Sequence, residues 1–317
     1  MRYRAYSDYL KEKYGEKVYK LPINLPLTCP NRDNTCGMGG CIFCGEQGAG
    51  LESLPNNFSV ARQLSVNKEY IAQKYKARKF IPYFQNFSNT YLPLDELAKH
   101  LFEAAAFDKD VVAVSLATRP DCLHDRHLEL LKNIQERYGI DITVELGLQT
   151  VNYHTLKKIN RGHTLAEFID AALRMKTRYG QIRLGAHVIL NLPWDNLDDV
   201  IENAKVLSAL KADEVKLHAL YLVRGTPLER WRQEGKIVLK SMEEYVEHTV
   251  TFLEYLHPDI ALGRLIGRAP AAAASFANWQ TAWWKIRDAI EERLAALDTY
   301  QGKKCDYLNG WAASKYI

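Results

Sequence analysis

Four cysteines lie close together near the start of the chain, in a pattern that suits metal chemistry. Cys41 and Cys44 are separated by two residues, a spacing that lets two thiolates reach one metal centre from a single turn. Cys29 precedes them across a glycine-rich loop, and glycine lets the backbone wrap closely around an inorganic core. Three thiolates on a [4Fe–4S] cluster leave one iron open, whereas four usually close it. The pattern favours an iron–sulfur cluster held by Cys29, Cys41 and Cys44.

A fourth cysteine in the same segment, Cys36, leaves a second interpretation open. Four thiolates at these spacings are also typical of a structural zinc site, because zinc prefers four ligands. The start of the chain carries no apolar export signal, so disulfides are the less favoured use of these thiols. The loop directly follows the first predicted strand. It is therefore expected at the carboxyl ends of the strands, where barrel enzymes build their active sites, and this position favours the cluster over zinc.

The elements that must position this loop alternate between strands and helices. Amphipathic helical patterns separate the strands, and two of them begin at capping boxes, Thr164 with Glu167 and Ser241 with Glu244. Six strand–helix units in succession predict an α/β fold: a parallel sheet curled by right-handed crossovers into a partial (β/α)6 TIM-like barrel, open on one side. Six short apolar runs are typical of buried parallel strands, at residues 18–24, 79–85, 111–117, 141–147, 182–190 and 214–220.

The composition excludes several classes of protein. The 317 residues carry a net charge of +4, with 47% hydrophobic and 25% charged residues, which is ordinary for a globular protein and too weakly basic for a DNA-coating protein. No stretch approaches the roughly 20 apolar residues of a membrane-spanning helix. We expect a cytoplasmic location and no membrane partner. Residues 1–255, including an N-terminal segment 1–17, are predicted to form the barrel core, and residues 256–317 an aromatic and basic C-terminal extension packed on it.

Six motifs give the chain a specific resemblance. Together, and in this order, they resemble the family of radical S-adenosylmethionine (SAM) proteins typified by YhcC and YtqA. That family is related to the radical SAM domain of the Elongator catalytic subunit and to oxygen-independent coproporphyrinogen oxidases. The motifs are TCPNRD and GGCIFC around the cysteines, QNFSNTY (85–91), TRPDCL (118–123), ELGLQT (145–150) and INRGHT (159–164), and DTYQGKK (298–304) resembles the family's end.

The resemblance implies a barrel of the radical SAM type, a [4Fe–4S] cluster on Cys29, Cys41 and Cys44, and SAM on the open iron. Cys36 is a non-cysteine position in the family's pattern. Such enzymes cleave SAM reductively to a 5′-deoxyadenosyl radical, which takes a hydrogen atom from the substrate, while the protein orients the cofactors. An electron donor such as a flavodoxin or ferredoxin is implied. No residue is assigned to catalysis itself.

In such folds SAM lies across the strand ends, so the residues there are candidate SAM contacts. After the second strand these are Gln85, Asn86 and Ser88, which could take up the ammonium group, although Asn-Phe-Ser-Asn is also an ordinary turn. The fourth strand offers Glu145. It also offers Gln149, followed by Arg161, whose planar fork suits the methionine carboxylate; the same pair contacts SAM in the coproporphyrinogen oxidase pattern.

The fifth strand ends in HVILNLPW (187–194), which resembles a family stretch that runs beside the adenine. His187 is expected to face the ribose or adenine, with the alternative that it is a satisfied core histidine. Asn191 is a further candidate contact, although it and Trp194 stand where the family has glycines. His218 and Tyr221, after the sixth strand, are expected either to face the substrate or to pack in the core.

The resemblance to YtqA and Elongator implies transfer RNA as the substrate, with the C5 substituent of the wobble uridine in the anticodon stem-loop as the group altered. That base must leave its loop to reach the barrel. The lysines of residues 73–80 and the tail (Lys303, Lys304 and Lys315) are candidate RNA contacts, or else a solvated surface. Two alternatives stay open: a radical SAM enzyme acting on a small metabolite or porphyrin-like molecule, and a non-catalytic RNA-binding protein with a four-cysteine zinc site.

Overall fold

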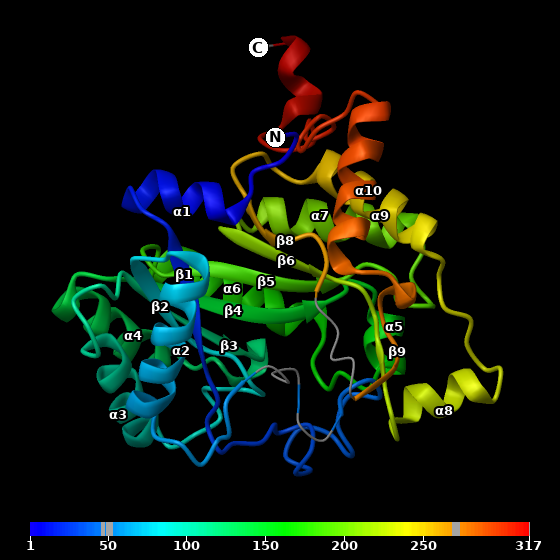
Figure 1. Ribbon diagram of the computed structural model, residues 1–317. Coiled ribbons are helices and arrows are strands. Elements are labelled where there is room, and N and C mark those ends of the chain that lie inside the picture. The colour runs from blue at the N-terminus through cyan, green and yellow to red at the C-terminus, as the bar shows by residue number, and fades with distance from the viewer. Residues whose placement is uncertain (46–47, 49–52, 268–272, 317) are drawn as a thin grey trace.

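The computed structural model describes residues 1–45, 48, 53–267 and 273–316. In this part of the chain, seven parallel strands form one sheet in the order β1-β2-β3-β4-β5-β6-β8, curled into a half-barrel (Figure 1). Both faces of the sheet are covered, which is why its strands are almost continuously buried. The strands are β1 (Val18–Ile23), β2 (Lys79–Phe84), β3 (Ala113–Thr118), β4 (Asp141–Gln149), β5 (Arg183–Ile189), β6 (Glu214–His218) and β8 (Ala261–Arg264).

Most of the helices that connect successive strands pack on the outer face of the half-barrel, whereas α8 (Pro227–Gln233) stands apart from the sheet (Figure 1). In α6, for example, Phe168 and Met175 are fully buried, and each such side chain contributes about 1.5–3 kcal/mol of hydrophobic stabilisation. The connecting helices are α2 (Val60–Tyr75), α3 (Leu94–Ala105), α4 (Asp125–Tyr138), α5 (Tyr153–Lys158), α6 (Leu165–Arg178), α7 (Leu197–Ala209), α8 (Pro227–Gln233) and α9 (Met242–Tyr255), with a short 3-10 turn η1 (Pro120–Cys122).

The expected capping boxes are present. The Thr164 side chain accepts from the Ala166 amide at the start of α6, and Glu167 accepts from the Thr164 amide. Ser241 and Glu244 make the same reciprocal pair at α9. These local signals fix where each helix begins, and therefore where the preceding loop must end.

The sheet has one strand more than the six we expected. The additional strand, β8, pairs in parallel with β6, so part of the segment 256–317 belongs to the sheet itself. Next to it, the helix α1 (Tyr6–Tyr14) closes the amino-terminal end of the half-barrel: Ala5 bridges to Leu262 of β8, and Leu10 packs with Val18 of β1. The helix α1 thus narrows the opening of the half-barrel at the amino ends of the strands, whereas it does not cover the carboxyl ends.

The rest of the C-terminal segment packs around this frame. The helix α10 (Trp283–Ala296) lies against α9, and the hairpin-like pair β7 (Leu222–Val223) and β9 (Ala274–Phe276) stands beside the sheet. Two 3-10 turns complete the fold, η2 (Asn278–Gln280) and η3 (Trp311–Tyr316). The tail ends at the top of Figure 1, on the opposite side of the molecule from the loop that follows β1. Within the described ranges no helix combines the length and apolarity needed to cross a bilayer.

Candidate active site

A cavity lies at the carboxyl ends of the strands and brings the cysteine loop together with four strand tips. Its volume is about 150 Å³, and about 790 Å³ of space is free of protein atoms when the part open to solvent is included. Three cysteines line it: Cys29, Cys41 and Cys44. The expected SAM contacts that line it are Gln85, Ser88, Glu145, Gln149, Arg161 and His187.

The three cavity cysteines have positive or hydrogen-bonding neighbours. Arg161 Nη1 lies 3.7 Å from the Cys41 Sγ, and Arg119 Nη1 lies 4.0 Å from the Cys29 Sγ. A guanidinium thus lies beside each of these two thiols. Burial and the neighbouring Cys41 raise the pKa of Cys44 to about 11, so metal binding there displaces the thiol proton.

Cys36 differs from the other three thiols in its position. Its side chain is exposed and does not line the cavity. Among the described residues, no three His, Cys, Asp or Glu side chains are gathered closely enough to hold a single metal ion. The thiols that line the cavity number three, which is the number that leaves one iron of a [4Fe–4S] cluster open.

A hydrogen-bonded clamp holds the cysteine loop in place. The Asn160 side chain donates to the carbonyls of Met38 and Gly40, at 2.7 Å each. In return, Asn31 donates to the Asn160 carbonyl at 2.6 Å and points the same amide nitrogen at the Cys41 Sγ, 3.5 Å away. A Cβ at Gly37 would lie 2.1 Å from the Asn31 Oδ1, so only glycine permits this packing. The INRGHT segment is thus joined to the cysteines directly.

Arg161 is held beside the cysteines with part of its donor capacity unused. Its Nη2 donates to the Gly147 carbonyl at 2.8 Å, while its buried Nε has no hydrogen-bond partner within the described residues. His163 also contacts the Gly147 carbonyl, at 3.0 Å, and burial together with Arg161 lowers the pKa of His163 to about 2, so its ring is neutral. Arg161 is therefore a cation beside the cysteines that has a free donor for an anionic ligand group.

The tip of β4 is shaped to bring two donors together. Gln149 has a left-handed backbone, φ 72°, at a register shift between β4 and β5, a conformation that non-glycine residues adopt mainly at functional sites. Gly147 allows close approach: a Cβ there would lie 2.5 Å from Arg161 Nη2 and 2.8 Å from Gln149 Nε2. The structure thus places Gln149 and Arg161 next to each other, as the SAM prediction requires.

Two of the expected SAM contacts have other neighbours. Asn86 is buried outside the cavity lining, and its Nδ2 donates to Asn24 Oδ1 at 2.8 Å. Asn191 is also buried, and its Oδ1 accepts from the Leu220 amide at 2.6 Å. The Ser88 hydroxyl and the Asn86 Oδ1 are both buried without a partner among the described atoms. Of the three residues, only Ser88 belongs to the described lining of the cavity, so it is the side chain available to a ligand there.

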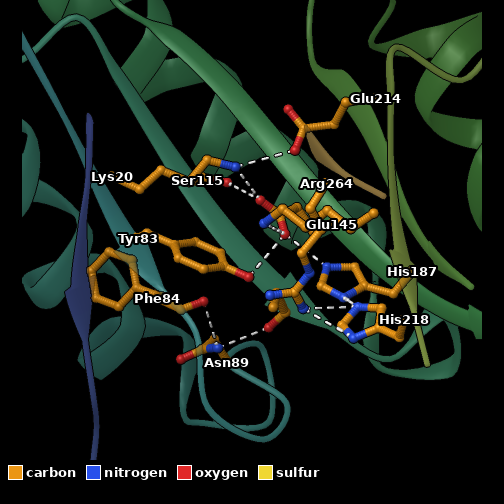
Figure 2. Close-up of polar contacts among 12 residues, drawn as sticks. Lys20, Tyr83, Phe84, Asn89, Ser115, Glu145, His187, Glu214, His218 and Arg264 are labelled. Carbon is orange, nitrogen blue, oxygen red and sulfur yellow. Dashed lines mark hydrogen bonds and ion pairs between the residues drawn. The ribbon is translucent and has the colours of Figure 1, made fainter. Parts of the chain in front are cut away.

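The loop after β2 is braced by the side chain of Asn89. Asn89 donates to the carbonyls of Phe84, Asn86 and Ala117, at 3.0, 3.0 and 2.8 Å (Figure 2 draws the first of these). Arg119 has a similar role after β3: it pairs with Asp121 at 2.6 Å and donates to the Arg161 carbonyl at 2.8 Å. The two residues fix the strand tips that face the cavity.

Glu145 is the centre of a buried polar network (Figure 2). Its fully buried carboxylate accepts from Lys20 and Lys216 at 2.5 Å each and from His187 at 2.7 Å. Burial alone raises the pKa of Glu145, but the two ammonium groups outweigh it and hold that pKa well below its usual value. Two further donors complete the shell, Tyr83 at 2.9 Å and Ser115 at 2.8 Å.

Glu145 and His187 line the cavity and also contact residues of β6, so the network extends from the cavity to that side of the barrel. His218 stacks on His187 with a ring-centroid distance of 5.1 Å, and Arg264 Nη2 lies 3.0 Å from the His218 ring nitrogens. Sequence reasoning missed Lys20, Lys216, Glu214 and Arg264. The available signal was a lysine inside each of two apolar strands, VYKLPI and EVKLH, because a charged side chain in such a strand needs a buried partner.

A partial α/β barrel with three thiols at the carboxyl ends of its strands is the architecture of the radical SAM enzymes. The model of the radical SAM superfamily matches residues 31–207, and that of the radical SAM C-terminal domain matches residues 212–296. The chain belongs to the radical SAM superfamily. Members of this superfamily use a [4Fe–4S] cluster and SAM, which confirms the expected cofactors.

Three similar proteins define the neighbourhood more closely. YtqA of Bacillus subtilis is 34% identical over 95% of this chain and 92% of its own length. A protein of Methanocaldococcus jannaschii named tRNA uridine(34) acetyltransferase is 26% identical over 43% of this chain and 24% of its own. The solved structure of Elp3 from Methanocaldococcus infernus superposes with a TM-score of 0.68 at 15% identity, over 90% of this chain and 64% of that one. The last likeness confirms the predicted barrel fold.

Proposed function

We propose that this radical SAM enzyme remodels the C5 substituent of the wobble uridine of tRNA, with its cluster held by Cys29, Cys41 and Cys44. The observation that carries the cluster assignment is that these three thiols line one cavity from which Cys36 is absent. When bound, the cluster and SAM supply a carbon-centred radical that removes a hydrogen atom from the substrate. An electron donor such as a flavodoxin or ferredoxin supplies the electron.

The residues of the chain then bind, orient and exclude water. Arg161, with its unpartnered Nε, and Gln149 hold the carboxylate of SAM. Ser88 and Gln85 accept from its ammonium group at the tip of β2. His187 faces the nucleoside part, and its bond to Glu145 keeps the ring in one orientation. Asn86 and Asn191 support these tips from outside the cavity.

The tRNA assignment is supported by the relative named tRNA uridine(34) acetyltransferase and by a basic surface beside the cysteine loop. The helices α5 and α8 both hydrogen-bond to Ile42 in the cysteine loop, at 3.1 Å each. We use "basic rim" for their exposed cations, which suit phosphates. These cations are Lys157, Lys158, Arg230 and Arg232.

The basic segments that we expected to contact RNA lie elsewhere. Residues 73–80 lead into the amino end of β2, whereas the cavity is at its carboxyl end, about 20 Å away for a strand of this length. The tail is on the side of the molecule opposite the cysteine loop (Figure 1). Of these three basic surfaces, the basic rim is the one joined to the cysteine loop, so it is the one proposed to contact the RNA around a flipped anticodon base.

Binding of tRNA across a salt series tests the surface. The double variant Arg230→Glu/Arg232→Glu is expected to bind tRNA about ten-fold or more weakly near 0.1 M salt, with a salt slope reduced by about 2. A control of equal charge change, Lys74→Glu/Lys315→Glu, is expected to bind within about two-fold of wild type. Equal losses in both variants would reject the basic rim as the tRNA surface.

Mass spectrometry of tRNA nucleosides tests the reaction. Cells that lack the gene are expected to accumulate a uridine derivative with an unprocessed C5 substituent, and the purified holoenzyme with SAM and a reductant is expected to convert it. An unchanged nucleoside profile in those cells would reject tRNA as the substrate.

A further inference from the structure

The side of the half-barrel formed by β6 and β8 carries a cation with no carboxylate partner. Arg264 makes no ion pair with any described residue, and its buried Nε has no hydrogen-bond partner among them. Within the described part of the chain, the only hydrogen-bonding contact of the Arg264 side chain is between Nη2 and the His218 ring, at 3.0 Å. A guanidinium is always charged in proteins, and even a half-buried charge such as that of Arg264 is less stable without a counter-ion.

The two nearby carboxylates are already occupied by lysines. Glu145 takes Lys20 and Lys216 at 2.5 Å each, and Glu214 takes Lys20 at 3.1 Å. Three cations, Lys20, Lys216 and Arg264, thus face two carboxylates across the interior. When Lys216 is protonated, the network therefore carries one positive charge in excess. This excess lies on the β6–β8 side of the barrel, where Lys216 of β6 is the register partner of Arg264 of β8.

The position of this excess charge separates it from the expected SAM contacts. The cavity is lined from β2, β3, β4 and β5 together with the cysteine loop, and Lys216, His218 and Arg264 are not in that lining. They adjoin it through His187, which stacks on His218 (Figure 2).

We propose that Arg264, with His218 and Lys216, forms a subsite for an anionic oxygen group of the substrate, a carboxylate or a phosphate, next to the SAM cavity. The free edge of the guanidinium, including Nε, can hold two oxygens side by side. Arg264 is a substrate-positioning residue. It holds the anionic oxygen group of the substrate, so that the carbon next to that group faces the SAM cavity. The identity of the substrate as a modified tRNA rests on the proposed function, whereas the presence of an anion subsite does not.

Small anions test the subsite without RNA. Sodium acetate and inorganic phosphate, exchanged for chloride at constant ionic strength, are expected to raise the thermal midpoint of the reconstituted wild-type enzyme. Arg264→Gln is expected to abolish that rise and to unfold at or above the wild-type midpoint without the anion, because it removes an uncompensated charge. Arg264→Lys should keep part of the response, and Arg287→Gln on the exposed face of α10 should keep all of it. A midpoint that neither anion moves, or an equal response in Arg264→Gln, would overturn the subsite.

Anticodon stem-loop RNAs then distinguish the source of the anion. Three RNAs with the same backbone are compared: a wobble uridine whose C5 substituent ends in a carboxylate, one that ends in an amine, and one without a substituent. Arg264→Gln is expected to weaken binding about 10- to 100-fold for the carboxylate RNA alone if the substituent supplies the anion, and for all three if a phosphate does. If no RNA binds while the small anions still do, the tRNA proposal fails and the subsite stands. An effect of Arg264→Gln on SAM affinity instead of on these ligands would overturn the assignment to substrate.

Discussion

Replacement of Glu145 by glutamine, Glu145→Gln, is expected to destabilise the protein more at pH 6 than at pH 8. The carboxylate compensates two buried ammonium groups at once, Lys20 and Lys216. Glutamine keeps an oxygen acceptor and removes the charge. Lys20 retains Glu214 at 3.1 Å, whereas Lys216 has no other carboxylate within ion-pair distance in the described part of the chain.

The expected size follows from the ion pair and from the pKa of Lys216. Removing one partner from a buried pair costs about 3–5 kcal/mol. Burial lowers the pKa of Lys216 to about 7 even beside Glu145, and without that carboxylate the pKa falls further. At pH 8 the amine is mostly neutral in both proteins. At pH 6 it is protonated in wild type alone, so the variant pays an additional cost of about 1–2 kcal/mol there.

The sign can be checked by proton linkage. Above about pH 7 the folded wild type binds fewer protons at Lys216 than the unfolded chain, so its stability rises with pH from that value upward. In Glu145→Gln the rise begins at a lower pH, because the pKa of Lys216 in the folded variant is lower still. The difference in free energy of unfolding between the two proteins therefore shrinks from pH 6 to pH 8.

Urea unfolding followed by circular dichroism, under anaerobic conditions on reconstituted protein, measures this difference. The double variant Glu145→Gln/Lys216→Met removes the stranded amine and is expected to be more stable than Glu145→Gln at pH 6. A loss in free energy of unfolding below about 1 kcal/mol for Glu145→Gln at both pH values would refute the charge network. The network would also be refuted if the stability changes of Glu145→Gln and Lys216→Met add up to that of the double variant, because coupled residues are not additive.

Three other expectations concern the cavity and its support. Arg161→Met should weaken SAM binding about 10- to 100-fold in equilibrium dialysis, because a charge-assisted hydrogen bond of about 1.5–3 kcal/mol is lost. Arg161→Lys keeps the charge and should weaken SAM binding by less. Unchanged affinity in Arg161→Met would exclude Arg161 as a SAM contact. Gly147→Ala should weaken SAM binding about ten-fold or more, while the free energy of unfolding in urea changes by less than about 1 kcal/mol. The new Cβ meets the ends of the Arg161 and Gln149 side chains, and their displacement disturbs the ligand and not the core. A large loss of stability would contradict this. Burial raises the pKa of Asp195 to about 6, so the folded state holds its proton over a range where the unfolded chain has released it, and stability falls as pH rises from about 4 to 6. Asp195→Asn should therefore unfold like wild type near pH 4 and be more stable by about 1–3 kcal/mol above pH 6.5, and a difference that does not change with pH would refute the assignment.

The regular part of the fold can be predicted from sequence because its signals are local. Each of the six expected strands is a buried apolar run, and capping boxes such as that of Thr164 and Glu167 mark where helices begin. The strand β8 gives no such signal. Its four residues, Ala261–Arg264, include a glycine and an arginine, and they become a strand because β6 leaves an edge to pair with. Such an element is defined by its partner, which lies far away in the sequence.

The candidate site divides in the same way. Spacing within one segment is enough to associate Cys41 with Cys44, and the family resemblance adds Gln149 and Arg161, which the structure places side by side. Which of two adjacent residues faces the cavity is harder to predict, as Gln85 and Asn86 illustrate: neighbouring side chains of an extended segment point opposite ways, so a one-residue shift reverses the assignment.

Local patterns point to buried charges in β1 and β6, but they do not predict which residues pair in the charge network. Lys20 and Glu145 are 125 residues apart, and only the closure of the sheet into a half-barrel brings them to 2.5 Å. The same closure leaves Arg264 without a carboxylate. The sequence shows that these charges exist, but their pairing is a property of the tertiary fold.

The most direct test is electron paramagnetic resonance of the chemically reduced protein, with and without SAM, on Cys36→Ala and Cys41→Ala prepared without oxygen. Cys36→Ala is expected to be brown, with broad absorption near roughly 400 nm, and to give a reduced-cluster signal that changes when SAM is added. Cys41→Ala is expected to lose the cluster. A colourless zinc-containing wild type, a loss of the metal in Cys36→Ala, or a cluster signal indifferent to SAM would contradict coordination by three thiols with one open iron.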